Sequence, residues 1–109
     1  MHELSITQSV VDAVCERAAG RPVHSVRVQV GMLTAVVADS MQFCFDLVTE
    51  GTVAEGARLE IDQPPGTGRC RLCDTVFALT DLVLLCPCGS VDVEVMSGRE
   101  LQIVSMRVG

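Results

Sequence analysis

The sequence has no lysine, tryptophan or tyrosine, and aromatic residues make up only 3% of its 109 residues. Without lysine, the chain can have neither a phosphate-binding loop of the usual kind nor a Schiff-base nucleophile, because both depend on the lysine amine. The net charge is −6 and no stretch is rich in arginine, so the clustered phosphate contacts of nucleic-acid binding are excluded. Few rings are available to stack on unpaired bases. We therefore expect no nucleic-acid partner.

Long apolar runs are also absent. The longest, Leu82–Cys86, is far shorter than the roughly 20 residues that a membrane helix needs. The first turns of the chain carry Glu3, Asp12 and Glu16 and lack the basic region of a signal peptide. From these features we expect a soluble, cytoplasmic protein with no membrane partner.

Apolar residues nevertheless make up 49% of the sequence, enough for one small core. The apolar periodicity predicts helices over residues 4–19 and 40–50, and strands over 23–30, 57–62 and 100–108. The last strand is apolar on both faces (Leu101 and Ile103 against Val104, Met106 and Val108), which is typical of a central strand. The predicted fold is α+β, a three-stranded sheet packed with two helices.

The predicted second helix has signals at both ends. Asp39 is a candidate N-cap, and Gln42, three residues later, completes a pattern like a capping box. Gly51 stands where a helix often ends in a left-handed residue.

Two breaks indicate an inserted subdomain. Residues 63–68 contain two prolines and two glycines, and Ser97-Gly98 forms a second joint. We predict one domain from residues 1–65 and 98–109, and an inserted zinc-ribbon-like subdomain from residues 66–97.

Four of the six cysteines lie in that insertion, as Cys70-Arg-Leu-Cys73 and Cys86-Pro-Cys88. Two such hooks can deliver four thiolates to a tetrahedral Zn²⁺. Without a secretory signal, metal is favoured over disulfides, although disulfides and unligated thiols remain alternatives. We predict a structural zinc site, with no open position for a reacting water. The second hook has one residue fewer between its cysteines than the first, so its N–H···S pattern must differ.

The N-terminus is a second candidate metal site. The α-amine of Met1, the backbone nitrogen and imidazole of His2, and the backbone nitrogen or carboxylate of Glu3 could chelate one ion. Nitrogen donors of this kind suit Ni²⁺ and Cu²⁺. Taken alone, the signal is weak, because a histidine near a terminus is usually solvated and Glu3 also suits the first turn of a helix.

Other polar and sulfur residues favour structural roles. His24 is expected to be partly buried near a sheet edge, with a remote nickel ligand as the alternative. Cys15 and Cys44 are interpreted as core residues, because free cysteine behaves as a small hydrophobe. Arg69 and Arg71 flank Cys70 and could offset the negative charge of a zinc–thiolate centre, contact an acidic partner, or be solvated.

The chain as a whole resembles the HypA/HybF family, the nickel metallochaperones of [NiFe]-hydrogenase maturation. The resemblance rests on the opening Met1-His2-Glu3-Leu4-Ser5-Ile6, on Glu50-Gly51-Thr52 and Glu55-Gly56-Ala57, on the two cysteine hooks with Gly89-Ser90, and on Gly98-Arg99-Glu100-Leu101. The C-x-C hook is one residue shorter than the C-P-x-C usual in that family.

This resemblance implies that His2 binds Ni(II), with Met1 and Glu3 beside it, and that Cys70, Cys73, Cys86 and Cys88 bind Zn(II). It implies a nickel-delivery protein and not an enzyme. The implied partners are a HypB-type GTPase metallochaperone, the [NiFe]-hydrogenase large-subunit precursor and, in some organisms, urease maturation proteins.

Three other functions are alternatives to nickel delivery. A zinc-stabilised interaction or regulatory module would be indifferent to the loss of His2. A metallohydrolase would need an open zinc position and a general base, and the sequence offers neither. A thiol redox sensor would release zinc on mild oxidation.

Overall fold

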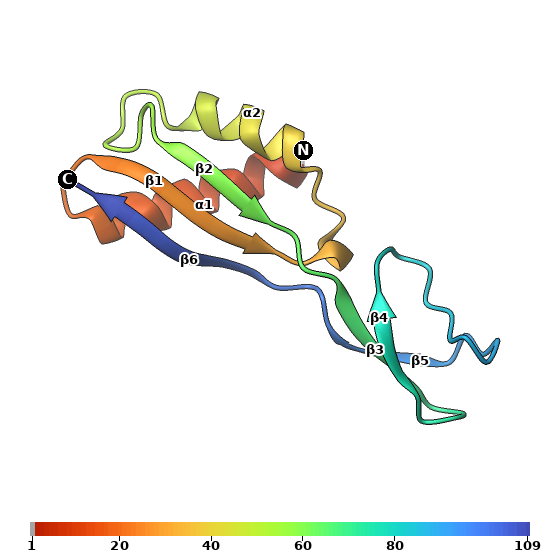
Figure 1. Cartoon of the computed structure of the whole chain (residues 1–109). Helices are drawn as coiled ribbons and strands as arrows, with labels where there is room; N and C mark the ends of the chain where they lie inside the picture. Colours follow the sequence, from red (N-terminus) through yellow and green to blue (C-terminus); the bar gives the residue numbers. More distant parts are fainter. Residues whose placement is uncertain (1) are drawn as a thin grey trace. The chain divides into compact units, whose positions relative to one another are not determined.

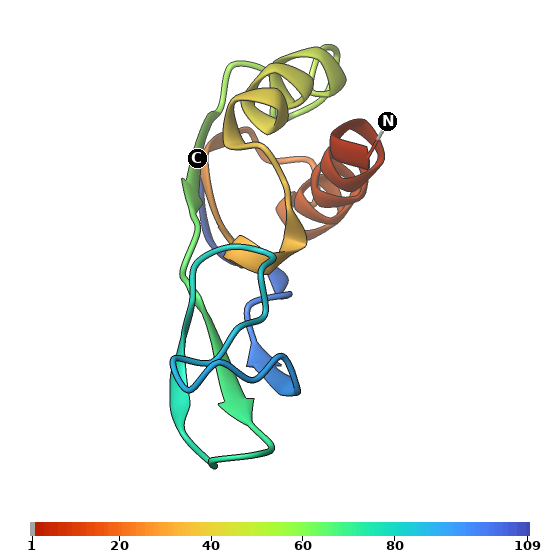
Figure 2. The ribbon, with the colours of Figure 1, turned by 90° about the vertical axis from the view of Figure 1, so that its right-hand side faces the viewer.

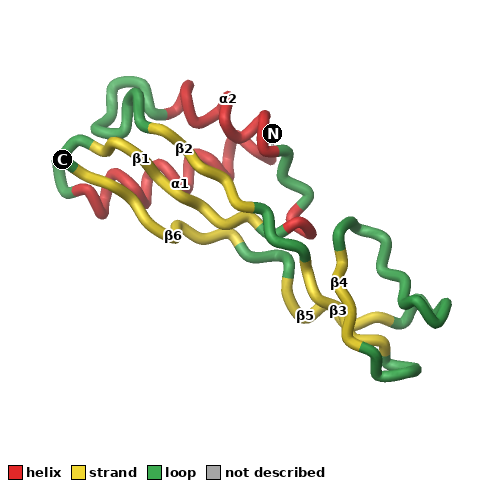
Figure 3. Tube along the Cα trace, in the orientation of Figure 1, coloured by secondary structure: helices red, strands yellow, loops and turns green. Residues whose placement is uncertain are grey.

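The computed structural model describes residues 2–109, and for His2 it describes only the backbone. This part of the chain forms two α-helices, one short 3-10 helix and six strands (Figures 1 and 3). In chain order, the elements are α1 (His2–Ala18), β1 (Val23–Val30), η1 (Met32–Thr34), α2 (Ala38–Val48), β2 (Arg58–Asp62), β3 (Gly66–Cys70), β4 (Val76–Leu79), β5 (Val93–Ser97) and β6 (Leu101–Val108). Among the described residues, no helix combines the length and the apolar character needed to cross a membrane.

The chain forms two compact units. The first contains the residues up to Val28, together with Val36–Ile61 and Gln102–Gly109. The second contains Gln29–Ala35 and Asp62–Leu101. The segment 29–35, which the sequence analysis assigned to the first domain, therefore packs within the second unit.

The first unit is an α+β layer structure, as predicted. Its sheet has the order β2-β1-β6, and both helices lie on one face of it (Figure 2). Strands β1 and β2 run in the same direction, so α2 serves as the crossover that a parallel pair requires (Figure 1). The core comes from the predicted apolar faces of the helices and from alternate residues of β1. Its fully buried members include Val11, Val14, Val26, Val28, Met41 and Phe45.

Strand β6 joins this sheet, as expected, but the prediction of a central position was wrong. β6 pairs with β1 at the edge, and β1 occupies the centre. Leu101 and Val104 remain 38% and 53% exposed. The apolar pattern of a strand shows which side chains could be buried, but the number of neighbouring strands depends on pairing between distant segments.

The capping prediction for the second helix was also wrong. The N-cap of α2 is Val37, without a side-chain cap, and Asp39 lies inside the first turn, where its charge suits the helix dipole. The Gln42 amide instead donates to the Leu59 carbonyl at 2.6 Å. Gly51 is left-handed, with φ +76°, as predicted.

The expected break at residues 63–68 is shorter than predicted, because β3 begins at Gly66. The second unit is a sheet with the order β4-β3-β5, in which β3 is central. A Cβ atom at Gly68 would lie only 2.9 Å from side-chain atoms of Leu79 and Val93. Glycine in β3 therefore marks the close packing of side chains from β4 and β5, and not a loop.

The two phenylalanines of α2 provide a matched test of this core. Phe45 is 1% exposed and Phe43 is 65% exposed. Phe45→Ala is expected to lower the free energy of unfolding by about 3–5 kcal/mol, because it leaves a cavity. Phe43→Ala is expected to change it by less than about 0.5 kcal/mol. Urea denaturation measures both, and equal losses would contradict the packing of α2.

Candidate metal centre

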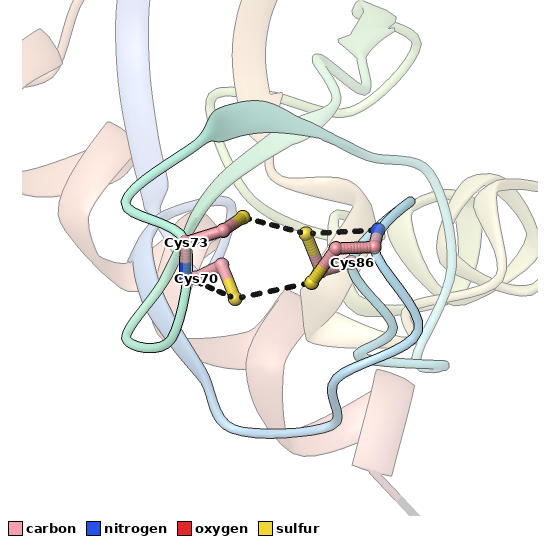
Figure 4. Close-up of side chains that lie close together, drawn as sticks. Cys70, Cys73 and Cys86 are labelled. Atoms are coloured by element: carbon pink, nitrogen blue, oxygen red, sulfur yellow. Dashed lines mark hydrogen bonds between the residues drawn. The ribbon is translucent and has the colours of Figure 1, made fainter.

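The four cysteines of the two hooks come together in the second unit. Cys70 ends β3, Cys73 lies in the turn that follows, and Cys86 and Cys88 lie in the loop before β5. Their four Sγ atoms all lie within 4.8 Å of one another. Figure 4 shows the sulfurs of Cys70 and Cys73 facing the hook that contains Cys86. The sequence prediction that these four residues converge is therefore met by the geometry.

The spacing of the sulfurs suits a tetrahedral ion. Cys70 Sγ lies 3.8 Å from Cys88 Sγ, and Cys73 Sγ lies 3.6 Å from Cys86 Sγ. Four sulfurs bound to one tetrahedral Zn²⁺ at about 2.3 Å each lie about 3.8 Å apart. The residues present thus fit a four-thiolate zinc site.

The first hook stabilises its leading sulfur with two backbone donors. The N–H groups of Leu72 and Cys73 both point at Cys70 Sγ, each at 3.4 Å. The turn is closed by the Asp74 N–H, which donates to the Cys70 carbonyl at 2.9 Å. Asp74 accepts a left-handed conformation, with φ +65°, to make that turn.

The second hook stabilises its first sulfur with one backbone donor instead of two. Among the described contacts, only the Cys88 N–H donates to Cys86 Sγ, at 3.4 Å. The loop then closes through the Gly89 N–H on the Cys86 carbonyl at 2.8 Å, and Gly89 has φ +96°. The Cys86 N–H donates a hydrogen bond to the Ser90 carbonyl at 2.9 Å. The expected difference in N–H···S pattern between the hooks is confirmed.

Each hook contributes one buried and one exposed thiol. Cys70 and Cys86 are 0% and 2% exposed, and they pack with the buried Val93 and the partly buried Phe77 and Leu84. Cys73 and Cys88 are exposed. This apolar cluster is small, so the second unit gains much of its cohesion from whatever ion the four sulfurs hold.

The surroundings of the thiols shift their pKa values in opposite directions. The hydrogen bond between Cys73 Sγ and the Thr75 hydroxyl, 3.1 Å long, and a second one with the Thr75 backbone N–H lower the pKa of Cys73 to about 6. The Cys73 N–H lowers the pKa of Cys70 more than burial raises it. At Cys86 the Cys88 N–H lowers the pKa, but burial and three neighbouring sulfurs together raise it to about 12. At neutral pH the metal-free site therefore holds Cys73 as a thiolate and Cys86 as a thiol.

The arginines that flank Cys70 are engaged in ion pairs. Arg69 pairs with Glu94 at 3.1 Å, and Arg71 pairs with Asp92 at 2.9 Å. Both contacts link β3, or the residue after it, to the segment around β5. These residues therefore brace the sheet that carries the first hook, although such exposed pairs contribute little stability.

The second candidate site lies partly outside the described residues. Met1 and the His2 side chain are not among them. The Glu3 carboxylate accepts a hydrogen bond from the Val37 N–H at 3.3 Å, at the start of α2. Glu3 also lines a groove of about 460 Å³ between the two helices, with Leu4, Asp39, Ser40, Phe43, Cys44 and Leu47. Asp39, interpreted from sequence as a cap, thus shares this groove with Glu3, which only the packing of the helices could reveal.

The remaining sequence candidates lie elsewhere in the first unit. His24 is exposed rather than partly buried, and Gly109 lies against its ring. Cys15 and Cys44 are of intermediate burial and unpaired, so they line the edge of the core and not its centre.

The fold and the four-cysteine group together define a small α+β protein with a metal-binding centre. A family model described as "Hydrogenase/urease nickel incorporation, metallochaperone, hypA" matches residues 1–108. The chain belongs to this HypA family, as its resemblance indicated.

Individual relatives agree with this assignment. The chain is 46% identical to a hydrogenase maturation factor HypA from Rippkaea orientalis over 109 residues, which cover 99% of this chain and 96% of the relative. It is 46% identical to the factor of the same name from Geobacter sulfurreducens over 110 residues, covering 99% of each. The fold matches the solution structure of the Ni metallochaperone HypA from Helicobacter pylori with a TM-score of 0.66 at 24% identity, covering 97% of this chain and 96% of that one.

Proposed function

We propose that this chain binds one Ni(II) ion at its N-terminus and delivers it during maturation of [NiFe]-hydrogenase. In this proposal, the nickel ligands are His2, Met1 and Glu3, and Cys70, Cys73, Cys86 and Cys88 hold a structural Zn(II). The domain of residues 1–65 and 98–109 is then the nickel-binding domain, and residues 66–97 form the zinc-binding one. The protein acts as a carrier and not as an enzyme.

The observation that best supports this proposal is the arrangement of the four cysteine sulfurs, which can fill the coordination sphere of one zinc ion. Four sulfurs at tetrahedral spacing saturate one zinc ion and leave no position for a second ion or an incoming ligand. Nickel that is handed on needs a separate and open set of donors. The α-amine, backbone nitrogen and imidazole of Met1 and His2 form such a set, with the nitrogen donors that Ni²⁺ favours.

The other histidine is a poor alternative ligand for electrostatic reasons. His24 lines a surface hollow together with Arg27, Arg58 and Arg107. Three guanidinium groups around one imidazole repel a divalent cation. Since the chain has only two histidines, this argument favours His2.

Delivery implies docking on other proteins. The partners that the family resemblance implies are a HypB-type GTPase metallochaperone that supplies or receives nickel, and the hydrogenase large-subunit precursor. The family description also names urease, so urease maturation proteins are further candidate recipients. A zinc-stabilised interaction module without nickel transfer is the alternative function, and it predicts no role for His2.

The experiment is a calorimetric nickel titration of zinc-replete protein with its authentic N-terminus, beside a chain extended by one glycine before Met1. We expect about one Ni²⁺ per authentic chain and strongly weakened binding to the extended chain, because the extension converts the α-amine into an amide. Equal binding to both chains would refute the N-terminal site. Binding to neither would favour the zinc-stabilised interaction module.

A further inference from the structure

The face of the β2-β1-β6 sheet that the helices leave uncovered contains a second surface hollow in the first unit. Its volume is about 740 Å³. The lining residues come from all three strands and from the turn before β2, and they are His24, Ser25, Arg27, Gly56, Arg58, Glu60, Ser105 and Arg107. We call this group of residues the arginine face.

The arginine face is positively charged in a protein whose net charge is −6. It holds three of the eight basic residues of the chain and one carboxylate, Glu60. Arg27 Nη2 lies 2.8 Å from Glu60 Oε2, which offsets one charge. Arg58 and Arg107 have no ion-pair partner in the part of the chain that the structure describes, so the face retains an excess of positive charge.

Strand geometry explains how the charges gather. Val26 and Val28 point into the core, so Ser25 and Arg27 of the same strand point away from it. In β2, Leu59 is buried, which turns Arg58 and Glu60 outward. Like charges gathered in one hollow repel one another, and an anion that lies between them relieves this repulsion.

We propose that the arginine face binds an acidic peptide segment of a partner protein. Guanidinium groups pair with carboxylates through two parallel hydrogen bonds, and the hydroxyls of Ser25 and Ser105 add further donors. The volume falls within the range of about 300–1,000 Å³ that is typical of sites for organic ligands, and exceeds what one inorganic anion fills.

This site is independent of nickel binding. The groove that contains Glu3 lies between the helices, whereas the arginine face lies on the other side of the sheet. A partner held by its acidic segment would therefore leave the N-terminus open to transfer an ion.

The test is fluorescence anisotropy with a dye-labelled hexaglutamate peptide at an ionic strength of about 0.15 M, where the Debye length is about 8 Å. The Arg58→Gln/Arg107→Gln variant is expected to weaken peptide binding by more than about tenfold, because two carboxylate-pairing groups are lost. The matched control is Arg17→Gln/Arg99→Gln, which removes two exposed arginines elsewhere and changes the net charge equally. It should bind within about twofold of the original chain, since screened charges at a distance contribute little.

Backbone amide shifts locate the peptide, and they should cluster at residues 24–27, 56–60 and 105–107. Equal weakening in both double variants, or shifts spread over the helices, would overturn the proposal in favour of nonspecific attraction. Tight binding of tripolyphosphate without binding of hexaglutamate would overturn it in favour of a phosphate site. Nickel binding by Arg58→Gln/Arg107→Gln should match that of the original chain, so failure of the nickel proposal remains distinguishable from failure of this one.

Discussion

Replacing His2 with alanine is expected to abolish stoichiometric nickel binding while leaving the zinc content unchanged. The α-amine, the backbone nitrogen of residue 2 and its imidazole chelate through fused rings, so the imidazole closes one of those rings. Loss of an outer-shell partner alone weakens metal binding by roughly 10–100-fold. Loss of a direct ligand should therefore weaken nickel binding by more than about 100-fold.

His24→Ala is the matched control for His2→Ala, because these are the only two histidines. The exposed His24 lies on the arginine face, whose guanidinium groups repel cations. Removal of His24 should therefore leave nickel affinity unchanged. Calorimetry on both variants, with zinc content checked by elemental analysis, gives the comparison. If His24→Ala lost nickel and His2→Ala kept it, the assignment of the nickel site would be reversed.

Replacing Cys86 with serine is expected to remove zinc and unfold the second unit. Cys86 is 2% exposed and packs with Val93 at the centre of the only buried cluster around the hooks in the described chain. A structural zinc site contributes about 10–16 kcal/mol of apparent free energy. This range is comparable to the entire stability of a small domain, about 5–15 kcal/mol. Loss of one thiolate should thus leave residues 66–97 without a stable fold.

Cys44→Ser provides the control for Cys86→Ser, since Cys44 lies on α2 and outside the quartet. It is expected to retain one zinc ion per chain. In Cys86→Ser, amide signals of β3, β4 and β5 should collapse to unfolded positions. Those of α1 and α2 should persist, because the helices carry none of the four hook cysteines. A Cys86→Ser chain with full zinc content and an unchanged spectrum would rule out the four-thiolate site.

The features of the fold and the site that the sequence could predict are local. The close spacing of the cysteines predicts the hooks at Cys70 and Cys86. The periodicity of apolar residues within each segment predicts the helices and strands. Gly51 likewise takes its left-handed conformation, shortly after the end of α2, through its own backbone preference. Only the structure, however, brings the two hooks, twelve residues apart, to tetrahedral spacing.

The parts that the sequence could not predict depend on contacts between distant segments. Gln42 looked like a capping residue, yet its amide reaches the Leu59 carbonyl, seventeen residues away. The edge position of β6 depends on which strand takes the centre, and its apolar pattern carries no information about that choice.

The arginine face is a candidate site that the sequence could not predict, because it also depends on contacts between distant segments. Arg27, Arg58 and Arg107 are scattered singly along an acidic chain, and no local motif links them. Their outward directions can be read from the alternation within each strand, but their proximity requires the strand order β2-β1-β6.

The most direct test of the central claim is X-ray absorption at the nickel and zinc edges, measured on one sample loaded with one ion of each metal per chain. Four sulfur neighbours are expected around zinc at about 2.3 Å. Around nickel, only nitrogen and oxygen neighbours are expected. Sulfur in the nickel shell, or nitrogen in place of sulfur around zinc, would contradict the assignment of nickel to the N-terminus and zinc to the cysteines.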